Sequence, residues 1–342
     1  RETRRLVDLE RLRKTSTAFL FGRERGATPG RYDKILATLL LTATVLFGLV
    51  FLYPELSIGR HSLNDSVFHY TASLRMSQAL GSGENPLDCW VGNYSLGYPV
   101  WRSYQPLPHF VTALLFKSAG TFFSTDAIYT FVFYLLLSLL PLCFYLFGRS
   151  AGLGPVGASV ASALSLTVSA AGELDRYGIG YGAFVWRGSG LYTQLWGLIF
   201  MLCALGAVLR SLRTGRGVPT AGLLLALTGL SHIVFGYVAL LSAALCCLAY
   251  QGQDAPCFVR RLHRIALVSI IALALMAFFL VPLWLDGEYI NHSRWEAEWK
   301  WNSLGAEAIT KKIVGGLFFD AGRWPVLTIL VGLGALLAAF RA

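Results

Sequence analysis

Residues 35–53 read ILATLLLTATVLFGLVFLY, an apolar run that carries no charged side chain. A helix of about 20 apolar residues crosses the roughly 30 Å hydrocarbon core of a bilayer. The run therefore predicts a membrane-spanning helix, and seven further apolar runs predict a bundle of such helices. They lie at residues 127–147, 155–171, 191–209, 219–233, 234–250, 265–285 and 325–340.

The composition indicates the same class of protein. Apolar residues make up 55% of the 342 residues and charged residues only 14%, whereas about a quarter of the residues in a soluble domain are charged. We therefore expect an all-α polytopic membrane protein with about eight transmembrane helices, and not a soluble fold. The chain begins without Met and ends just after an apolar run, which is typical of an excerpt from a longer protein.

The distribution of basic residues predicts the orientation. With the N-terminus in the cytoplasm, the short Arg-rich segments all fall on the cytoplasmic side and hold more than half of the 29 Lys and Arg residues. This is the positive-inside pattern. The segments are residues 1–34, Arg149, 210–216, 260–264 and Arg341. The net charge of +10 is thus a topology signal. We expect residues 1–34 to bind anionic membrane lipids and we expect no nucleic-acid partner.

Three long segments then face the outer side, at residues 54–123, 172–190 and 286–324. Loops longer than about 15 residues are usually functional, so these should carry the active surface of the transmembrane domain, residues 35–342. Within the first loop, residues 107–123 are apolar but include His109 and Lys117. That pattern predicts an interfacial helix lying on the membrane.

The first loop contains a candidate acid–base pair, Asp65 and His69. On a helix these two residues are four apart and share a face, so a carboxylate and an imidazole can address one substrate group. The same pattern also fits a plain interfacial helix that is capped at Asn64 or Asp65.

An aromatic stretch follows in the same loop, with Trp90, Tyr98, Trp101 and Tyr104 ahead of His109. Trp and Tyr rings stack on sugars, but they also form the interfacial belt of membrane proteins. The long polar loop around them favours substrate binding.

The second loop offers carboxylates for a metal. Glu173 and Asp175 lie two residues apart and, together with Asp65, could hold a divalent cation such as Mg²⁺ or Mn²⁺. The alternative is a solvated Glu173 and an Asp175 paired with Arg176. The six cysteines show no metal-ligand spacing.

Two further residues are candidates for substrate contacts. Arg187 could hold a phosphate through its guanidinium group. His232 is predicted at the outer tip of a tight helical hairpin, where an ionisable group is costly and is either functional or snorkels to the surface.

The order of several motifs resembles the GT-C superfamily of membrane glycosyltransferases. These motifs are the acidic residue Asp65 after the first span, then Gly97-Tyr98-Pro99, Tyr104-Gln105-Pro106-Leu107-Pro108, and Phe147-Gly148-Arg149. The likeness covers roughly residues 35–250 and is nearest to bacterial and archaeal membrane proteins described as related to 6-pyruvoyl-tetrahydropterin synthase.

The resemblance implies an active site in the first outer loop, a polyprenyl-phosphate-linked sugar donor and inverting transfer to a glycan, lipid or protein acceptor. It maps the catalytic acid of the family onto Asp65 and the paired metal-binding acids of oligosaccharyltransferases onto Glu173 and Asp175. It also implies a prokaryotic plasma-membrane protein. The rival interpretations are a lipid-intermediate transporter or flippase, and a non-catalytic membrane assembly subunit.

Overall fold

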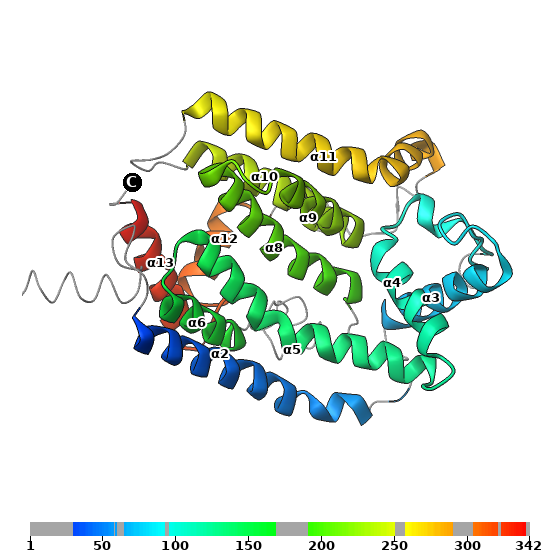
Figure 1. Cartoon of the computed structure of the whole chain (residues 1–342), viewed down its shortest axis with the longest axis horizontal. Coiled ribbons are helices and arrows are strands. Elements are labelled where there is room, and N and C mark those ends of the chain that lie inside the picture. Colours follow the sequence, from blue (N-terminus) through cyan, green and yellow to red (C-terminus); the bar gives the residue numbers. More distant parts are fainter. Residues whose placement is uncertain are drawn as a thin grey trace, which may run out of the picture.

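The computed structural model describes residues 30–57, 59, 65–92, 96–168, 191–249, 257–289, 304–320 and 323–339. These residues are mostly helical, and they form a bundle of long helices with a smaller helical cap at one end (Figure 1). The expected all-α fold is confirmed.

Each of the eight predicted apolar runs contains a helix. Among the described residues four are long and apolar enough to cross a membrane, namely α2 (Arg31–Phe51), α5 (Thr125–Ala151), α8 (Tyr192–Thr214) and α11 (Phe258–Leu285). The shorter apolar helices are α6 (Pro155–Leu164), α9 (Val218–Ser231), α10 (Ile233–Ala249) and α13 (Val326–Ala339). Helix α6 continues to Thr167 as the 3-10 helix η3 (Ser165–Thr167). A count of eight crossings stays a prediction.

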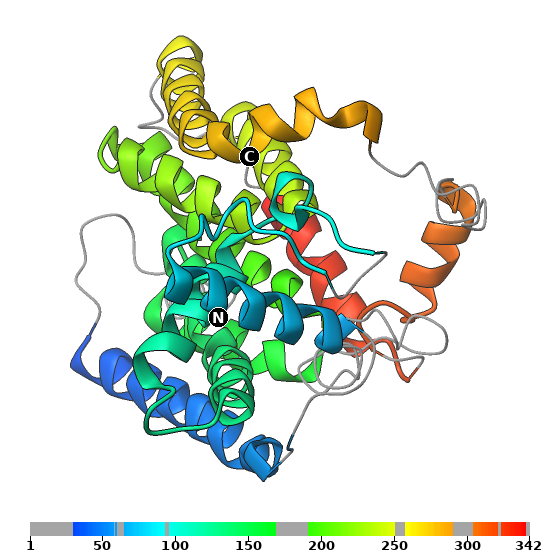
Figure 2. The same cartoon turned by 90° about the vertical axis from the view of Figure 1, so that its right-hand side faces the viewer.

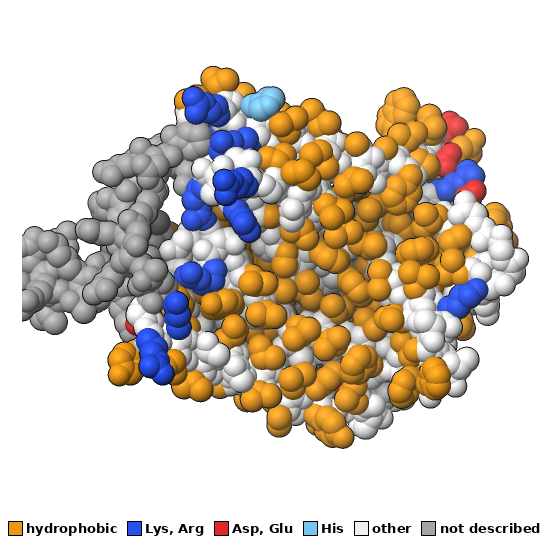
Figure 3. Space-filling model, in the orientation of Figure 1, with side chains coloured by type: hydrophobic (Ala, Val, Ile, Leu, Met, Phe, Trp, Pro, Cys, Tyr) orange, Lys and Arg blue, Asp and Glu red, His pale blue; other side chains and the backbone are white. Residues whose placement is uncertain are grey.

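The outer surface of the bundle is apolar. Large side chains on its outermost helices are largely exposed, including Leu39 at 62%, Val50 at 73% and Ile270 at 61%. Figure 3 shows apolar side chains across the middle of one face, with Lys and Arg gathered at the end away from the cap. So large an apolar surface is unfavourable in water but suits a lipid environment. The chain is therefore an integral membrane protein.

Helix α8 lies at the centre of the bundle. It packs against α5, α9 and α10, and it contributes to two apolar clusters, one around Tyr129 and Leu195 and the other around Leu212 and Leu225. Its first turn points toward the cap (Figure 1), so the bundle holds Tyr192 at the boundary between the two parts.

Helices α9 and α10 form the predicted tight hairpin, with His232 at the turn. Two glycines allow the helices to touch. A Cβ atom added to Gly236 would lie 2.6 Å from the Cα atom of Gly229, a distance that no side chain tolerates without moving the backbone. This close contact fixes the position of His232.

The cap covers the end of the bundle where α5 and α8 begin (Figure 2). It consists of η1 (Tyr53–Ser57), α3 (Asp65–Ser82), η2 (Val100–Arg102) and α4 (Leu107–Ala119). Its own apolar core includes Met76, Val91 and Trp101. Helix α4 lies where residues 107–123 predicted an interfacial helix, although it ends at Ala119. Outside the cap, η5 (Gly287–Tyr289) and α12 (Ala306–Val314) follow α11.

The Gly236→Ala variant should destabilise the protein, because its new methyl group meets the backbone of Gly229. We expect overpacking to cost about 1–3 kcal/mol in the free energy of unfolding, measured by thermal denaturation in detergent. The matched control is Gly332→Ala on α13, where an added Cβ meets nothing within 4 Å. Equal denaturation midpoints for the two variants would contradict the close packing of this hairpin.

Candidate functional site

Polar contacts fasten the cap to the bundle. The hydroxyl groups of Tyr70 and Thr125 lie 2.7 Å apart and join α3 to the start of α5. Arg102 donates to the carboxylate of Asp88 at 2.7 and 3.2 Å and lies 3.6 Å from Asp286 at the end of α11. The cap is therefore tied to the bundle at the start of α5 and at the end of α11.

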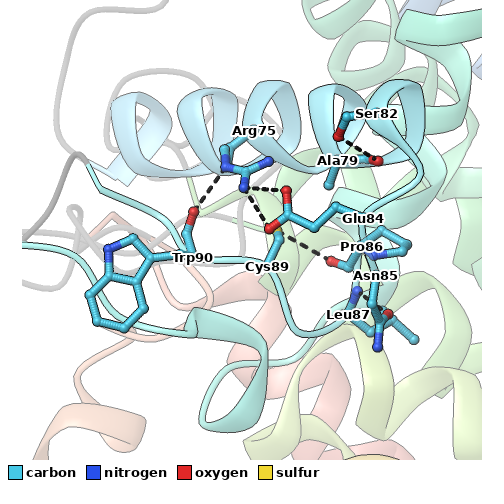
Figure 4. Close-up of polar contacts among 9 residues, drawn as sticks. All are labelled: Arg75, Ala79, Ser82, Glu84, Asn85, Pro86, Leu87, Cys89 and Trp90. Atoms are coloured by element: carbon cyan, nitrogen blue, oxygen red, sulfur yellow. Dashed lines mark hydrogen bonds and ion pairs between the residues drawn. The ribbon is translucent and has the colours of Figure 1, made fainter.

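Arg75 on α3 organises the first part of this loop (Figure 4). Its Nε atom donates to the carbonyl oxygen of Trp90 at 2.8 Å, and its Nη2 atom contacts both carboxylate oxygens of Glu84 at 2.8 and 2.5 Å. The backbone N–H of Leu87 donates to the side chain of Asn85 at 3.0 Å and closes a local turn. Arg75 thus binds the side chain of Glu84 at one end of residues 84–90 and the backbone of Trp90 at the other.

A buried histidine pair lies within the cap, between its helices α3 and α4. Nδ1 of His69 on α3 is 3.0 Å from Nε2 of His109 on α4, so one ring donates a hydrogen bond to the other. His69 is 2% exposed and His109 is 0% exposed. The pair occupies Nδ1 of His69 and leaves its Nε2 for another partner. The structure therefore joins two predicted site residues that are 40 positions apart.

Both histidines are neutral in this environment. Burial and, second, the nearby His232 lower the pKa of His69 from 6.5 to about 3. Burial also lowers the pKa of His109 well below its ordinary value, and His69 adds to this effect. A buried charge without a counterion is strongly disfavoured. The two imidazoles can therefore donate and accept hydrogen bonds at neutral pH while both remain uncharged.

Aromatic and hydroxyl side chains surround the pair. The rings of Tyr104 and Tyr192 lie 6.1 and 6.0 Å from the ring of His69. Tyr192 at the start of α8 shares a short hydrogen bond with Thr112 on α4. Thr193 is 3.4 Å from the hydroxyl of Tyr104. Helix α8 therefore completes the polar lining under the cap.

His232 is the third histidine near this centre. It packs against α8 at Gly197, where an added Cβ would lie 2.6 Å from the Cβ of His232. Its Nδ1 atom accepts a hydrogen bond from the backbone N–H of Phe235 at 3.3 Å. Since Nδ1 is an acceptor, the proton of the neutral ring is on Nε2. The nearby His232 contributes to the lowered pKa of His69.

Asp65 occupies the first helical position of α3 and keeps contact with solvent. Burial nevertheless raises the pKa of its carboxyl group above the ordinary value. Burial mainly, and Asp65 to a lesser degree, raise the pKa of Tyr104 to about 12. The carboxylate is therefore near Tyr104, at the rim of the buried cluster, while His69 lies one helical turn deeper.

The predicted aromatic residues divide into two groups. Trp90 is 55% exposed and Tyr98 is 36% exposed, whereas Trp101 is only 3% exposed. The ring of Trp101 lies 4.8 Å from that of His109. Gly97 has φ of +93°, and the indole of Trp90 fills the space where a Cβ would be. Trp90 and Tyr98 can thus meet a ligand, while the burial of Trp101 favours a packing role.

The predicted Glu173, Asp175 and Arg187 lie outside the described residues. Within the described part of the chain, no cluster of three His, Cys, Asp or Glu side chains has the geometry to hold a metal ion. The three-residue metal set therefore stays a prediction.

Sequence reasoning does not identify three residues of the site. Thr112, Tyr192 and Thr193 are all buried and polar beneath the cap, but Tyr192 and Thr193 stand at the start of an apolar run that predicts only a span. A polar pair at the outer end of a span is a weak signal, because the same residues are common at membrane interfaces.

No protein-family model matches the chain, and no curated protein matches it. The interpretation of the site therefore rests on the residues and contacts described above.

The His69→Gln variant should make stability less dependent on pH. Between pH 6.5 and about 3, unfolded His69 binds a proton that the folded protein does not, so wild-type stability should fall as the pH falls through this window. The slope is at most about 1.4 kcal/mol per pH unit for each such histidine.

Thermal denaturation of the wild type and the variant from pH 7 to 4 measures the difference between their pH slopes. Carboxylates titrate in both proteins, so their contribution cancels in the comparison. His263→Gln, which changes an exposed histidine of α11, is the control and should parallel the wild type. An unchanged slope in His69→Gln would contradict the assignment of a buried neutral pair.

Proposed function

We propose that this protein is a GT-C-type glycosyltransferase that moves a sugar from a polyprenyl-phosphate-linked donor to a glycan, lipid or protein acceptor. The observation that carries the proposal is the convergence beneath one cap of Asp65, His69, Tyr104, His109 and His232. An exposed carboxylate stands there at the rim of buried neutral imidazoles, and the loop between α3 and α4 carries two exposed aromatic rings, Trp90 and Tyr98.

In this reaction Asp65 is the general base. The acceptor hydroxyl oxygen forms a bond to the anomeric carbon of the sugar, the bond from that carbon to the phosphate oxygen breaks, and the configuration inverts. Asp65 takes the hydroxyl proton, and the polyprenyl phosphate leaves with the bonding electron pair. Burial raises the pKa of this carboxyl group, and a higher pKa makes its carboxylate a stronger base.

The buried residues have supporting roles. His69 and His109 form a rigid neutral layer below Asp65, with Tyr104 and His232 at its edges. Trp90 and Tyr98 offer exposed rings on which a sugar can stack. A site that mixes a fixed carboxylate with aromatic surfaces is suited to a neutral sugar ring.

The leaving phosphate needs positive charge. Arg102 is engaged by Asp88 and Asp286, so its charge is already compensated. We assign this role to Arg187, or to a Mg²⁺ or Mn²⁺ ion held by Asp65, Glu173 and Asp175.

The orientation follows from charge. The Lys and Arg residues at the end opposite the cap support a cytoplasmic position for that end. The cap then faces the periplasm or cell exterior, and we propose the plasma membrane of a prokaryote as the location.

The Asp65→Asn variant should lose at least about a hundredfold in transfer rate, since a general base contributes about 10²–10⁴-fold. The assay follows radiolabelled sugar from polyprenyl-phosphate donors to membrane acceptors. The control Glu307→Gln neutralises an exposed carboxylate on α12 that pairs only with Lys311 among the described residues, and it should keep wild-type activity. Equal activity of Asp65→Asn and wild type would reject Asp65 as the base.

The same assay separates the rival functions. A transporter or flippase would move the lipid-linked sugar across the membrane without forming a new glycosidic bond. A non-catalytic assembly subunit would do neither. Lack of transfer by the wild type across a broad donor panel would therefore reject the enzyme proposal.

The pH profile should identify the base. If Asp65 is the base, kcat/KM is high above the pKa of its carboxyl group and falls as the pH drops through that pKa. Burial raises this pKa, so the acidic limb of the profile should lie above the ordinary carboxyl value of 3.8. The activity that remains in His69→Gln should show the same limb. Disappearance of the limb in His69→Gln would assign the base to the histidine instead.

A further inference from the structure

A second binding feature lies far from the cap. A cavity of about 310 Å³ opens at the opposite end of the bundle, where α5 ends, α8 ends and α9 begins. No residue of the proposed catalytic site lines it.

The lining of this cavity changes from apolar to polar along the helices. Leu146 and Ser150 lie one turn apart on α5, and Leu202 and Arg210 lie two turns apart on α8. At 1.5 Å per residue, Leu202 is about 12 Å deeper in the bundle than Arg210. Both helices thus place a leucine toward the middle of the bundle and a polar residue toward its end. Such a lining fits a ligand with an apolar chain and a polar head.

The polar end of the cavity carries an available positive charge. Arg149, Arg213 and Arg264 at this end donate hydrogen bonds to backbone carbonyl groups. Arg210 is exposed, and its guanidinium group has no ion pair or hydrogen bond among the described residues. Because α8 ends only four residues later at Thr214, the guanidinium group lies at the depth expected for lipid headgroups.

We propose that this cavity binds an anionic phospholipid from the surrounding leaflet. One acyl chain lies against Leu146 and Leu202, and the phosphate is held by Arg210 with the hydroxyl groups of Ser150 and Thr220, which also line the cavity. The apolar half excludes a soluble phosphate as the main ligand, since that ligand would leave those walls unfilled. This inference does not depend on the proposed glycosyltransferase activity.

Lipid binding to the purified full chain tests the proposal. Native mass spectrometry in mild detergent would compare phosphatidylglycerol with phosphatidylcholine of the same acyl chains. The wild type should prefer phosphatidylglycerol, and Arg210→Gln should lose about fivefold of that preference, the effect of about one arginine contact. The matched control is Arg216→Gln, which removes an equal charge from the adjacent turn outside the cavity lining, and its preference should stay near that of the wild type.

A cavity-filling variant tests the apolar half independently. Ala207→Phe places a large ring into the lining while Arg210 stays, and it should weaken binding of both lipids at this site. Three results would overturn the proposal: equal losses in Arg210→Gln and Arg216→Gln, undiminished lipid binding in Ala207→Phe, or displacement of the bound lipid by inorganic phosphate.

Discussion

The contact between His69 and His109 is the interaction on which the candidate site depends. Polar rings at the end of an apolar bundle are unfavourable unless they find partners within the protein. Each imidazole finds one partner in the other at 3.0 Å, and this contact joins α3 to α4. The two cap helices are thereby held together, while the hydrogen bond between Thr112 and Tyr192 joins α4 to the first turn of α8. Asp65 stands at the rim, at the first position of α3.

This arrangement separates two demands that the proposed function places on a membrane protein. The bundle must be apolar outside, which the exposed Leu, Ile and Val side chains achieve, and its interior is held by close helix contacts such as that between Gly229 and Gly236. The chemistry must instead take place where water and polar substrates have access. Placing the polar groups in a separate cap with its own small core meets both demands.

Sequence reasoning predicts some of these features well and others not at all. Long charge-free runs predict helices such as α2 and α11, since in lipid only a helix satisfies its own backbone. Asp65, His69, His109 and His232 can be chosen as candidates, because ionisable groups next to spans are conspicuous.

The partnerships are beyond such reasoning. Helical periodicity does not encode how α3, α4 and α8 pack against one another. It therefore cannot predict the contact between His69 and His109 or that between Tyr192 and Thr112. The same limit applies to burial: Trp90 and Trp101 look alike in sequence, but one is exposed and the other is in the core of the cap.

The most direct measurement is photocrosslinking with a polyprenyl-phosphate-sugar donor that carries a photoreactive group on the sugar, followed by mass spectrometry of the labelled peptides. We expect the label on peptides from residues 65–109, reduced by excess unlabelled donor. Competable labelling confined to peptides of the opposite, arginine-rich end would contradict a sugar site beneath the cap.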